Sequence, residues 1–502
     1  MVEKTDVLIA GAGPTGLVLA LWLTRLGVKS RIVDKAEHPG ETSRALAVHA
    51  RTLELYEQVG IAQSVVDHAR KMDAARLWVR GRQRARLVFG DMGVGVSPFP
   101  YVLVYPQDEH ERLLIAHLAE AGVVVERPTE LIAAETMGEG VIARLRKADG
   151  SEESVEAAYL AGCDGARSKV REILGAEFPG GTYSRLFYVA DVEGGGSVMN
   201  AELNLALDKG DFLAVFPMRG VGRARLVGDI EHVGGEDLSF EDVGQTVIQR
   251  LGVQIKAVNW FSTYRVHHRV AGSWRQGPMF LLGDAAHIHS PVGGQGMNTG
   301  IGDAVNLAWK LAHVIKGNAG AGLLDSYEPE RIAFARRLVA STDRAFQIIS
   351  RDDPLARFIR LEVAPRVLPA VFSFAPLRRL MFLTISQTNV NYRDGPLAEG
   401  SAGKVRGGDR LPWVREAKNY APLARLEWRG QVHGEFEDGL AAKCADAGLP
   451  LDRFVWTPAA ASAGFARGAF HLVRPDGYVA LVASKGAPAS LAAYQARHGL
   501  RF

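Results

Sequence analysis

The chain has 502 residues, which is too many for a single hydrophobic core, so two or three domains are expected. Its apolar share of 47%, charged share of 23% and net charge of +3 are typical of a globular enzyme and give no argument for nucleic-acid or membrane binding. Two cysteines, Cys163 and Cys444, argue against a disulfide framework or a cysteine metal site and favour a reducing, cytoplasmic setting.

The N-terminal segment predicts a strand, a tight turn and a helix. The apolar run Val7–Ala10 leads into the motif G-A-G-P-T-G at residues 11–16, and an apolar stretch follows. In this fingerprint Gly11 takes the turn, Gly13 lets the backbone approach a pyrophosphate, and Gly16 allows close packing of helix and strand. The helix N-terminus would then present free N–H groups to a diphosphate.

A second predicted strand, Ser30–Val33, ends at Asp34. The fingerprint expects an acid roughly 20 residues after the turn, where it accepts a ribose hydroxyl. The alternative is a glycine-rich turn without a ligand. The strand, helix, second strand and terminal acid together argue against that alternative.

The β-α-β pattern of one parallel sheet continues after Asp34. Helices are expected at 51–59 and 109–121 from their apolar spacing, and strands at 123–126 and 152–161 from their apolar runs. The chain then changes character. Residues 176–270 show short strand-like runs between glycine-rich turns, which predicts a mostly antiparallel inserted sheet. The expected strands are 187–192, 203–207, 212–216, 223–230 and 260–266, with one helix at 242–251.

The apolar, basic stretch 360–384 contains three prolines and is predicted to be a helical lid or interface rather than a membrane-surface helix. A polar link at 389–400 precedes a new αβ pattern, which predicts a small third domain with a strand at 478–483.

Two further motifs carry chemistry. The first is C-D-G-A-R-S-K-V-R at residues 163–171. The second is L-G-D-A-A-H at 282–287, followed by G-G-Q-G-M-N at 293–298. The glycines of the last segment would let backbone lie against a planar ring, and the following helix N-terminus would favour negative charge there. Together with the first fingerprint, these motifs indicate one flavin site assembled from distant parts of the chain.

With these motifs placed, the chain resembles the single-component FAD-dependent aromatic hydroxylases of the para-hydroxybenzoate hydroxylase class. It is most similar to the phenol and polyketide hydroxylases that carry a C-terminal thioredoxin-like domain. The resemblance implies an α/β fold with a discontinuous, Rossmann-like FAD-binding domain at 1–175 and 271–394. It further implies an inserted, mostly antiparallel substrate domain at 176–270 and a thioredoxin-like domain at 395–502. The last match rests mainly on residues 474–481.

The resemblance also implies a set of cofactor-binding residues: Gly11, Gly13, Gly16, Asp34, Arg44, Gln107, Asp164, Asp284, Gly294, Gly296, Met297 and Asn298. Two residues are candidates for a catalytic role. Arg44 would contact the FAD diphosphate and the nicotinamide cofactor, and Pro291 would face the reacting edge of the flavin.

Several of these residues have simpler interpretations. Arg44 and Arg51 could be surface charges at the start of a helix, and Gln107 could be a polar residue at a helix start. Asp164 could cap a turn without binding any ligand. Asp284 lies between an apolar strand and small residues, so it is expected to be buried with a partner, because an unpaired buried carboxylate is costly. His287 and His289 have no nearby acid or thiol set, and no metal site is expected.

In this class, NAD(P)H, expected to be NADPH, reduces non-covalent FAD. A flavin C4a-hydroperoxide then transfers one oxygen atom from O₂ to a phenolic or polycyclic, polyketide-like ring. The expected partners are thus a small aromatic substrate and O₂, with no nucleic acid and no membrane. Whether the chain forms a homodimer is left open. Two alternatives remain: a flavin-dependent reductase, and a flavin-fold binding protein without turnover.

Overall fold

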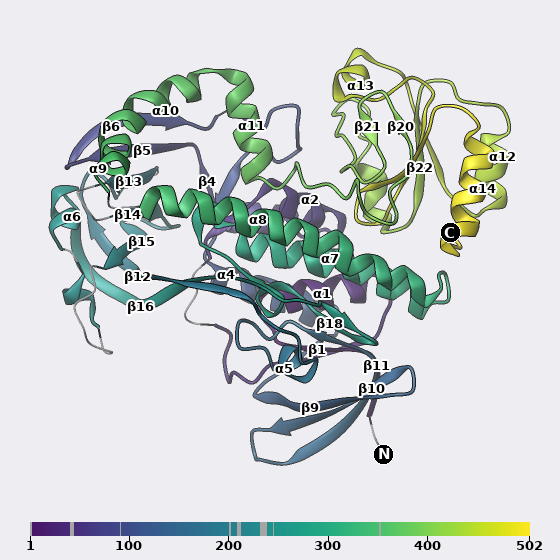
Figure 1. Cartoon of the computed structure of the whole chain (residues 1–502), viewed down its shortest axis with the longest axis horizontal. Helices are drawn as coiled ribbons and strands as arrows, with labels where there is room; N and C mark the ends of the chain where they lie inside the picture. The colour runs from purple at the N-terminus through teal and green to yellow at the C-terminus, as the bar shows by residue number, and fades with distance from the viewer. Residues whose placement is uncertain are drawn as a thin grey trace.

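The computed structural model describes residues 3–40, 45–90, 92–199, 202–207, 212–230, 238–243, 245–350 and 353–502, with 184, 292 and 345–350 described by their backbone alone. Within these ranges the chain has an α/β fold with mixed sheets, two of which have eight strands each. Figure 1 shows the first sheet below helices α7 (Gly296–Ile315) and α8 (Tyr327–Ser350), the second at the left, and a C-terminal unit (395–502) at the upper right.

The first sheet contains the parallel strands predicted around the glycine-rich turn. Strands β18, β11, β1, β2 and β8 lie in this order and run parallel, and β17 pairs antiparallel with β18. Val7, Leu8 and Ile9 are fully buried in succession, as in a parallel strand covered on both faces. The bounds are β1 Glu3–Ala10, β2 Ser30–Val33, β8 Val125–Glu126, β11 Glu152–Gly162, β17 Arg275–Gln276 and β18 Met279–Leu281.

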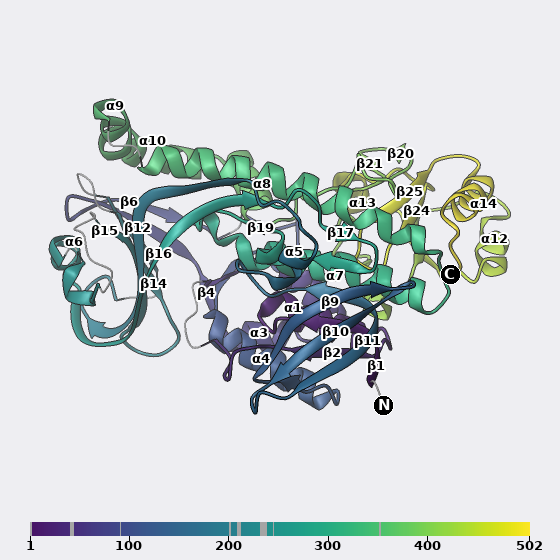
Figure 2. The ribbon, with the colours of Figure 1, turned by 60° about the horizontal axis from the view of Figure 1, so that its bottom comes forward.

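An antiparallel hairpin, β9 (Thr129–Met137) and β10 (Gly140–Lys147), extends this sheet from β11 (Figure 2). Sequence analysis did not identify it. On the sheet, helix α1 (Pro14–Arg25) packs against α7 and against α4 (Gln107–Glu120). The approach of α7 is close, because a Cβ on Gly300 would lie 2.3 Å from Thr15 Oγ1.

The second sheet has the order β19-β16-β12-β15-β14-β13-β5-β6, and only the neighbours β13 and β5 are parallel. Strands β5 and β6 precede the segment 176–270 and were not identified from the sequence. The bounds are β5 Ala74–Val79, β6 Arg82–Val88, β12 Gly180–Gly195, β13 Leu203–Leu207, β14 Phe212–Pro217, β15 Arg223–Ile230, β16 Gln254–Val270 and β19 His287–Ile288.

Short elements join the two sheets. A three-stranded sheet of order β3-β7-β4 is formed by residues between 47 and 104, and strands β5 and β6 of the second sheet lie between β4 and β7 in the sequence. The remaining bounds are β3 Ala47–Val48, α2 Ala50–Gln58, α3 Ala62–His68, β4 Arg70–Met72, β7 Val102–Val104, α5 Lys169–Ile173, η1 Phe240–Asp242, α6 Gln245–Arg250, η2 Gly283–Ala285, η3 Val292–Gly294 and η4 Ala321–Ser326.

The stretch predicted as a lid or interface is helical. It forms α9 (Pro354–Phe358), the π-helical turn η5 (Ile359–Val363), α10 (Ala364–Ser373) and α11 (Ala375–Ile385). Helix α10 packs on β6. Among the described residues, no single helix is long and apolar enough to cross a membrane. The bent pair 354–373 and 375–385 meets that test by length and composition only.

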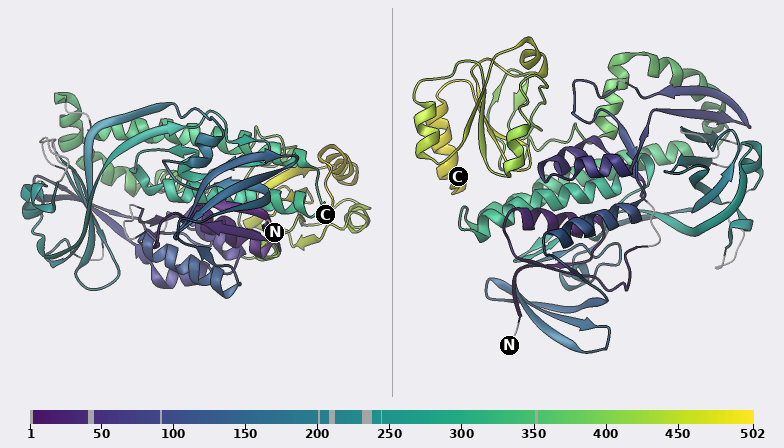
Figure 3. Two further views of the ribbon diagram at one scale, coloured as in Figure 1. Left: turned by 90° about the horizontal axis from the view of Figure 1, so that it is seen from below. Right: turned by 180° about the vertical axis from the view of Figure 1, so that it is seen from behind.

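The C-terminal unit has a four-stranded sheet of order β23-β22-β24-β25, with β22 and β23 parallel and the other neighbours antiparallel. It sits against one end of α7 and α8 (Figure 3). At that junction the Trp309 and Trp428 rings meet edge to face, 5.4 Å apart. The bounds are β20 Ser401–Ala402, β21 Val405–Arg406, η6 Ala421–Arg425, β22 Arg429–His433, α12 Leu440–Asp446, β23 Leu451–Phe454, α13 Pro458–Ala463, β24 Phe470–Val473, β25 Val479–Ala483 and α14 Ala487–His498.

Buried ion pairs also tie this unit to the rest of the chain. Arg474 lies 2.7 Å from Glu330 of α8, and Arg410 lies 2.8 Å from Glu54 of α2. Arg51 is buried as well: it pairs with Glu54 and donates to the Asp476 carbonyl oxygen. The interpretation of Arg51 as a surface charge is therefore wrong.

Candidate active site

The three glycines of the first fingerprint have different surroundings. Gly11 has φ +101°, and a Cβ there would lie 2.3 Å from the Cys163 carbonyl oxygen. A Cβ on Gly16 would lie 2.0 Å from the Gly11 carbonyl oxygen. Protein atoms thus require glycine at both positions. A Cβ on Gly13 would meet no atom of the described residues within 4 Å, so the turn is open at the glycine that the fingerprint assigns to the pyrophosphate.

A cavity of about 250 Å³ lies beside this turn, and Gly11, Gly13, Asp34 and Asp164 all line it. Asp34 holds the turn itself, since its carboxylate accepts from the Ala12 N–H at 2.7 Å and lies 3.2 Å from Arg127. One oxygen also accepts from the Ala36 N–H. The predicted acid is therefore next to the glycine turn, and its carboxylate already has protein partners.

Asp164 caps helix α5. It accepts hydrogen bonds from the Lys169 N–H at 2.6 Å and the Val170 N–H at 3.1 Å, and the Ser168 hydroxyl donates to its other oxygen. These are the contacts expected of the simpler, capping interpretation. Because Asp164 also lines the cavity of Gly11 and Gly13, capping does not exclude contact with a ligand.

The Gly-Asp motif forms the 3₁₀ turn η2, with Gly283 at φ +57°. The side chain of Asp284 is exposed, so the expectation that it is buried is wrong. The reason is that β18 ends before η2, and the turn projects Asp284 from the sheet while Gly283 and Ala285 stay buried.

A buried acid that sequence analysis missed holds this turn. Asp303 of α7 accepts from the Gly283 N–H at 3.0 Å, and it also contacts His287 at 2.9 Å and Arg331 at 2.6 Å. Burial opposes its ionisation, but the Arg331 guanidinium and the hydrogen bonds from His287 and the Gly283 N–H hold the pKa of the Asp303 carboxyl below its usual range. His287 thus has a carboxylate partner inside the fold, and it supports the turn rather than facing a cavity.

The glycine-rich loop after the Gly-Asp motif has two residues with positive φ, Gly293 at +79° and Gly294 at +62°. A buried histidine that sequence analysis also missed supports it. His49 Nε2 lies 3.0 Å from the Gly293 carbonyl oxygen and 3.1 Å from that of Gly294. Burial lowers the pKa of His49 to about 4, so the ring is neutral near pH 7 and donates from Nε2.

Asn298 is also structural through its side chain. Its amide nitrogen donates to the carbonyl oxygens of Ala47 and Gly294. Its amide oxygen accepts from the backbone N–H of His49 and from the Thr52 hydroxyl. All four hydrogen-bonding positions of this buried side chain are therefore occupied by protein groups. Only the backbone of Asn298 is left to contact a cofactor.

The other predicted residues are less informative. Gly296 begins α7 and Met297 follows it, so the N-terminal amides of a 20-residue helix lie directly behind the loop. Gln107 begins α4 and donates to Glu111 at 2.8 Å. Arg44 lies outside the described residues.

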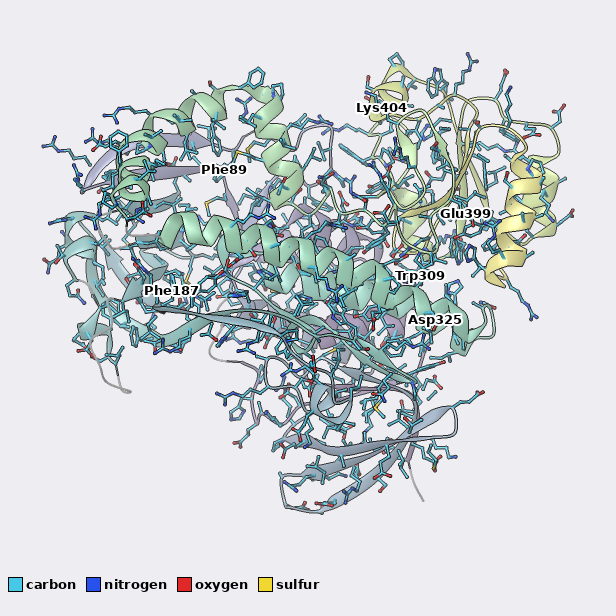
Figure 4. The ribbon with its side chains drawn as sticks, in the orientation of Figure 1. Phe89, Phe187, Trp309, Asp325, Glu399 and Lys404 are labelled. Atoms are coloured by element: carbon cyan, nitrogen blue, oxygen red, sulfur yellow. The ribbon has the colours of Figure 1, made fainter. Side chains whose placement is uncertain are left out.

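A larger cavity of about 420 Å³ begins at this loop, where Pro291, Gly293, Gly294 and His49 line it. Figure 4 shows Phe89 under helices α10 and α11 and Phe187 on β12; both line the cavity. The other apolar lining residues come mainly from β13, β14, β15, the three-stranded sheet and α11: Leu46, Ala47, Met72, Met92, Val102, Val104, Leu203, Leu205, Leu207, Phe212, Ala214, Phe216, Val227, Phe382 and Ile385.

These two cavities and the segments between them fit FAD. The open position at Gly13 and the N-terminus of α1 suit a diphosphate, since a helix N-terminus binds anions. The exposed Asp284 suits a sugar hydroxyl. The loop at 293–294, backed by the N-terminus of α7, suits a flat ring that gains negative charge.

Comparison with known proteins agrees with this geometry. Residues 4–342 match the model of a family described as "FAD binding domain". The 6-methylpretetramide 4-monooxygenase of Streptomyces rimosus is 38% identical over 81% of this chain and 73% of its own length. A flavin-dependent monooxygenase of Mycobacteroides abscessus is 30% identical over 96% of this chain and 97% of its own length. The solved structure of OxyS anhydrotetracycline hydroxylase from Streptomyces rimosus covers 98% of both chains, with a TM-score of 0.78 and 29% identity.

Proposed function

The chain belongs to the FAD binding domain family as an FAD-dependent monooxygenase of the aromatic hydroxylase class, and we propose that it hydroxylates an aromatic substrate held in the 420 Å³ cavity. FAD is its cofactor and NAD(P)H, which we propose to be NADPH, is its reductant. The observation that carries the proposal is that this apolar cavity begins at Pro291, Gly293 and Gly294. The relatives named for 6-methylpretetramide and anhydrotetracycline support an aromatic substrate.

Bound FAD supplies the activation of O₂ after reduction by NAD(P)H. The protein's own groups position the reactants and exclude water. We propose that Gly11, Gly13 and Gly16 accommodate the diphosphate of FAD. Asp34 and Asp164 would flank this diphosphate. Asp284 would bind a ribose or ribityl hydroxyl on the flavin side of the cofactor. The proposal for Gly13 rests on the open position there, and that for Asp284 rests on the exposure of its side chain in the turn η2.

The flavin ring would lie against the loop that His49 and Asn298 hold. We propose that Pro291 faces its reacting edge and that Gly294, Gly296, Met297 and Asn298 contribute backbone at the N-terminus of α7, which stabilises negative charge. The apolar walls of the cavity exclude water, which matters because water would divert activated oxygen from the substrate. Arg44 remains the proposed contact of the nicotinamide cofactor, and Gln107 that of the ribityl chain.

We propose three domains: FAD-binding at 1–175 and 271–394, substrate-binding at 176–270, and thioredoxin-like at 395–502. Strands β5 and β6 join the sheet of the second domain although they lie in the first segment. For the third domain, the support is the strand order β23-β22-β24-β25 with only β22 and β23 parallel, helices α12 and α13 between strands, and α14 after the last. It holds Cys444 alone, so a Cys-x-x-Cys redox role is excluded.

The cellular setting and assembly are also proposals. Cys163 and Cys444 are both free and buried, which supports a reducing compartment such as the cytoplasm. We retain a homodimer as the proposed assembly, which the molar mass in solution tests.

The test of the function is a screen of NAD(P)H oxidation across phenols and multi-ring aromatic compounds, with the product mass measured for each. The proposal requires substrate-stimulated oxidation and a product that contains one added oxygen atom. Oxidation without an oxygenated product across the panel would favour the reductase alternative. Protein that purifies colourless and does not oxidise NAD(P)H when FAD is added would favour the non-catalytic binding protein.

A further inference from the structure

The end of helix α11 forms part of the wall of the large cavity. Phe382 and Ile385 of this helix line the cavity together with Gly293 and Gly294 of the glycine-rich loop. The loop at which we place the flavin ring and the last turn of α11 therefore border the same space. Oxygen transfer depends on the separation between these two borders, because a misplacement of about 1 Å can cost roughly a hundredfold in rate.

Gln295 follows Gly294 in the loop, and its side chain joins the loop to α11. The amide nitrogen of Gln295 donates to the Ile385 carbonyl oxygen at 2.8 Å. The side chain is only 5% exposed, so its other polar atom, Oε1, needs a donor from the protein.

Gln387, which comes just after α11, supplies that donor. Its amide nitrogen donates to Gln295 Oε1 at 2.7 Å and to Thr299 Oγ1 at 3.0 Å. Thr299 belongs to the first turn of α7, whose N-terminus lies behind the loop. One buried side chain thus completes the hydrogen bonding of Gln295 and also contacts the helix that supports the loop.

Gln387 also has an unusual backbone conformation. It lies two residues after the end of α11 and has φ +59°, in the left-handed region. Glycine is the usual residue where a helix ends in this conformation, because a Cβ is disfavoured there. The need to end the helix would therefore favour glycine, and the two hydrogen bonds of the side chain give a reason for glutamine at this position.

The connection through Gln387 differs from the other two supports of the loop in what it joins. His49 and Asn298 fix the loop to the segment 47–52, which contains β3 and the start of α2. Gln387 fixes it to the last turn of α11 instead. With the first two supports alone, the loop and the α11 wall of the cavity could still move relative to one another.

We propose that Gln387 is a positioning residue for the hydroxylation: acting through Gln295, it sets the separation between the flavin-binding loop and the α11 wall of the substrate cavity. The inference rests on the proposed function, since it takes the flavin ring to lie on this loop. Gln387 is not among the described residues that line the large cavity, so it acts on the reactants only through other residues.

The first measurement is the FAD dissociation constant of two variants, from fluorescence titration of the apoprotein. Gln387→Gly accepts the left-handed backbone and removes the side chain, and Gln387→Asn accepts the backbone but is too short to reach Gln295. A residue that only ended the helix could be replaced by glycine without loss. We expect both variants to bind FAD about fivefold more weakly or worse, because the loop loses its connection to α11.

The second measurement is hydrogen exchange of the backbone amides, recorded with and without FAD. In the wild type, FAD should slow exchange both in the loop and first turn of α7, residues 293–299, and in the last turn of α11, residues 382–386, because the side chains of Gln295 and Gln387 join the two segments. In Gln387→Gly, FAD should still slow exchange in residues 293–299, but its effect on residues 382–386 should be lost.

The matched control is Thr388→Val. Thr388 follows Gln387 and is buried as well, and its hydroxyl is hydrogen-bonded within its own segment, to the Ser386 hydroxyl at 2.8 Å. The substitution removes that hydrogen bond at nearly constant volume and leaves the contacts of Gln387 in place. The control should keep the FAD affinity and the exchange pattern of the wild type.

Wild-type FAD affinity in Gln387→Gly would overturn the positioning role, and so would an effect of FAD on residues 382–386 that survives in this variant. Equal losses in Thr388→Val would assign the effect to general loosening of the segment and would equally overturn it. Because neither measurement needs turnover, these outcomes are separate from failure of the proposed function, which would appear as absent substrate-stimulated NAD(P)H oxidation.

Discussion

The side-chain amide of Asn298 donates a hydrogen bond to the carbonyl oxygen of Gly294 at 2.9 Å. The same amide donates to the Ala47 carbonyl oxygen at 2.8 Å. One side chain thus fixes the glycine-rich loop to the strand that precedes His49, across 251 positions of sequence. The loop that we assign to the flavin ring is therefore rigidly supported from behind.

Replacing Asn298 with alanine should weaken FAD binding about tenfold or more. It leaves buried donors and acceptors without partners, at a cost of about 1–3 kcal/mol for each unsatisfied group. The measurement is the FAD dissociation constant from fluorescence titration of the apoprotein. An Asn298→Ala protein with wild-type FAD affinity would show that the loop does not contact the flavin.

His49 offers a sharper comparison. Glutamine can place its amide nitrogen where histidine has Nε2, whereas asparagine is too short to do so. His49→Gln should therefore keep the bonds to the Gly293 and Gly294 carbonyl oxygens and retain FAD, and His49→Asn should lose FAD affinity. Equal FAD affinity of the two variants would contradict the role of His49 Nε2 as the support of the loop.

His49 also gives a pH dependence. Its pKa in the folded protein, about 4, lies below the ordinary value of 6.5, so the unfolded chain binds the extra proton first. Stability from this group is present above pH 6.5 and is lost as the pH falls toward 4. As the pH falls from 6.5 to 4, the fraction of FAD released should rise less steeply in His49→Gln than in the wild type, as measured by flavin fluorescence.

Substitution of Asp284 should lower the affinity for FAD and leave the stability of the fold nearly unchanged. Because its side chain is exposed, Asp284→Ala should change the free energy of unfolding by about 0.5 kcal/mol or less. A lost charged hydrogen bond to FAD should still cost about 1.5–3 kcal/mol of cofactor affinity. Denaturation of the apoprotein and FAD titration measure the two quantities. Unchanged FAD affinity would remove Asp284 from the site.

The junction with the C-terminal unit should depend on Glu330. Burial opposes its ionisation, but Arg474 and Lys310 lower the pKa of Glu330 to about 2, from an ordinary value of 4.5. Glu330→Gln should destabilise the protein by about 3–5 kcal/mol at pH 7, because it removes the carboxylate that pairs with the buried Lys310 and leaves Arg474 paired with Asp476 alone.

The sign of the pH effect follows from the lowered pKa. The stabilisation by Glu330 is present above pH 4.5 and is lost as the pH falls toward 2, so the difference between wild type and Glu330→Gln should narrow below pH 4.5. Denaturant midpoints across this range measure it. A constant difference would contradict the ionised state of Glu330.

Local patterns in the sequence predicted the elements that depend on neighbouring residues. The Gly11–Gly16 turn, strand β1 and the long α7 follow from glycine placement and apolar periodicity. Strand β6 pairs with β5 in a local hairpin, and it was missed because its sequence is rich in exposed arginines. Strand β5 was missed because its pairing with β13 is set by residues more than 120 positions away. Such pairing leaves little local signal in the sequence.

The site shows the same division. The glycine motifs identified the loops, but His49, Asp303 and Arg331 were missed because their roles depend on partners from other elements. The expected burial of Asp284 failed for a related reason: flanking apolar residues cannot indicate that a 3₁₀ turn projects one side chain outward.

The most direct test of the account is turnover under ¹⁸O₂ with NADPH, the FAD-loaded protein and the aromatic compounds that stimulate NAD(P)H oxidation. The account predicts a hydroxylated aromatic product in which one oxygen atom carries the ¹⁸O label, with the second atom of O₂ released as water. Hydroxylated product without the label, or NADPH oxidation that yields only peroxide with every aromatic compound that binds, would contradict it.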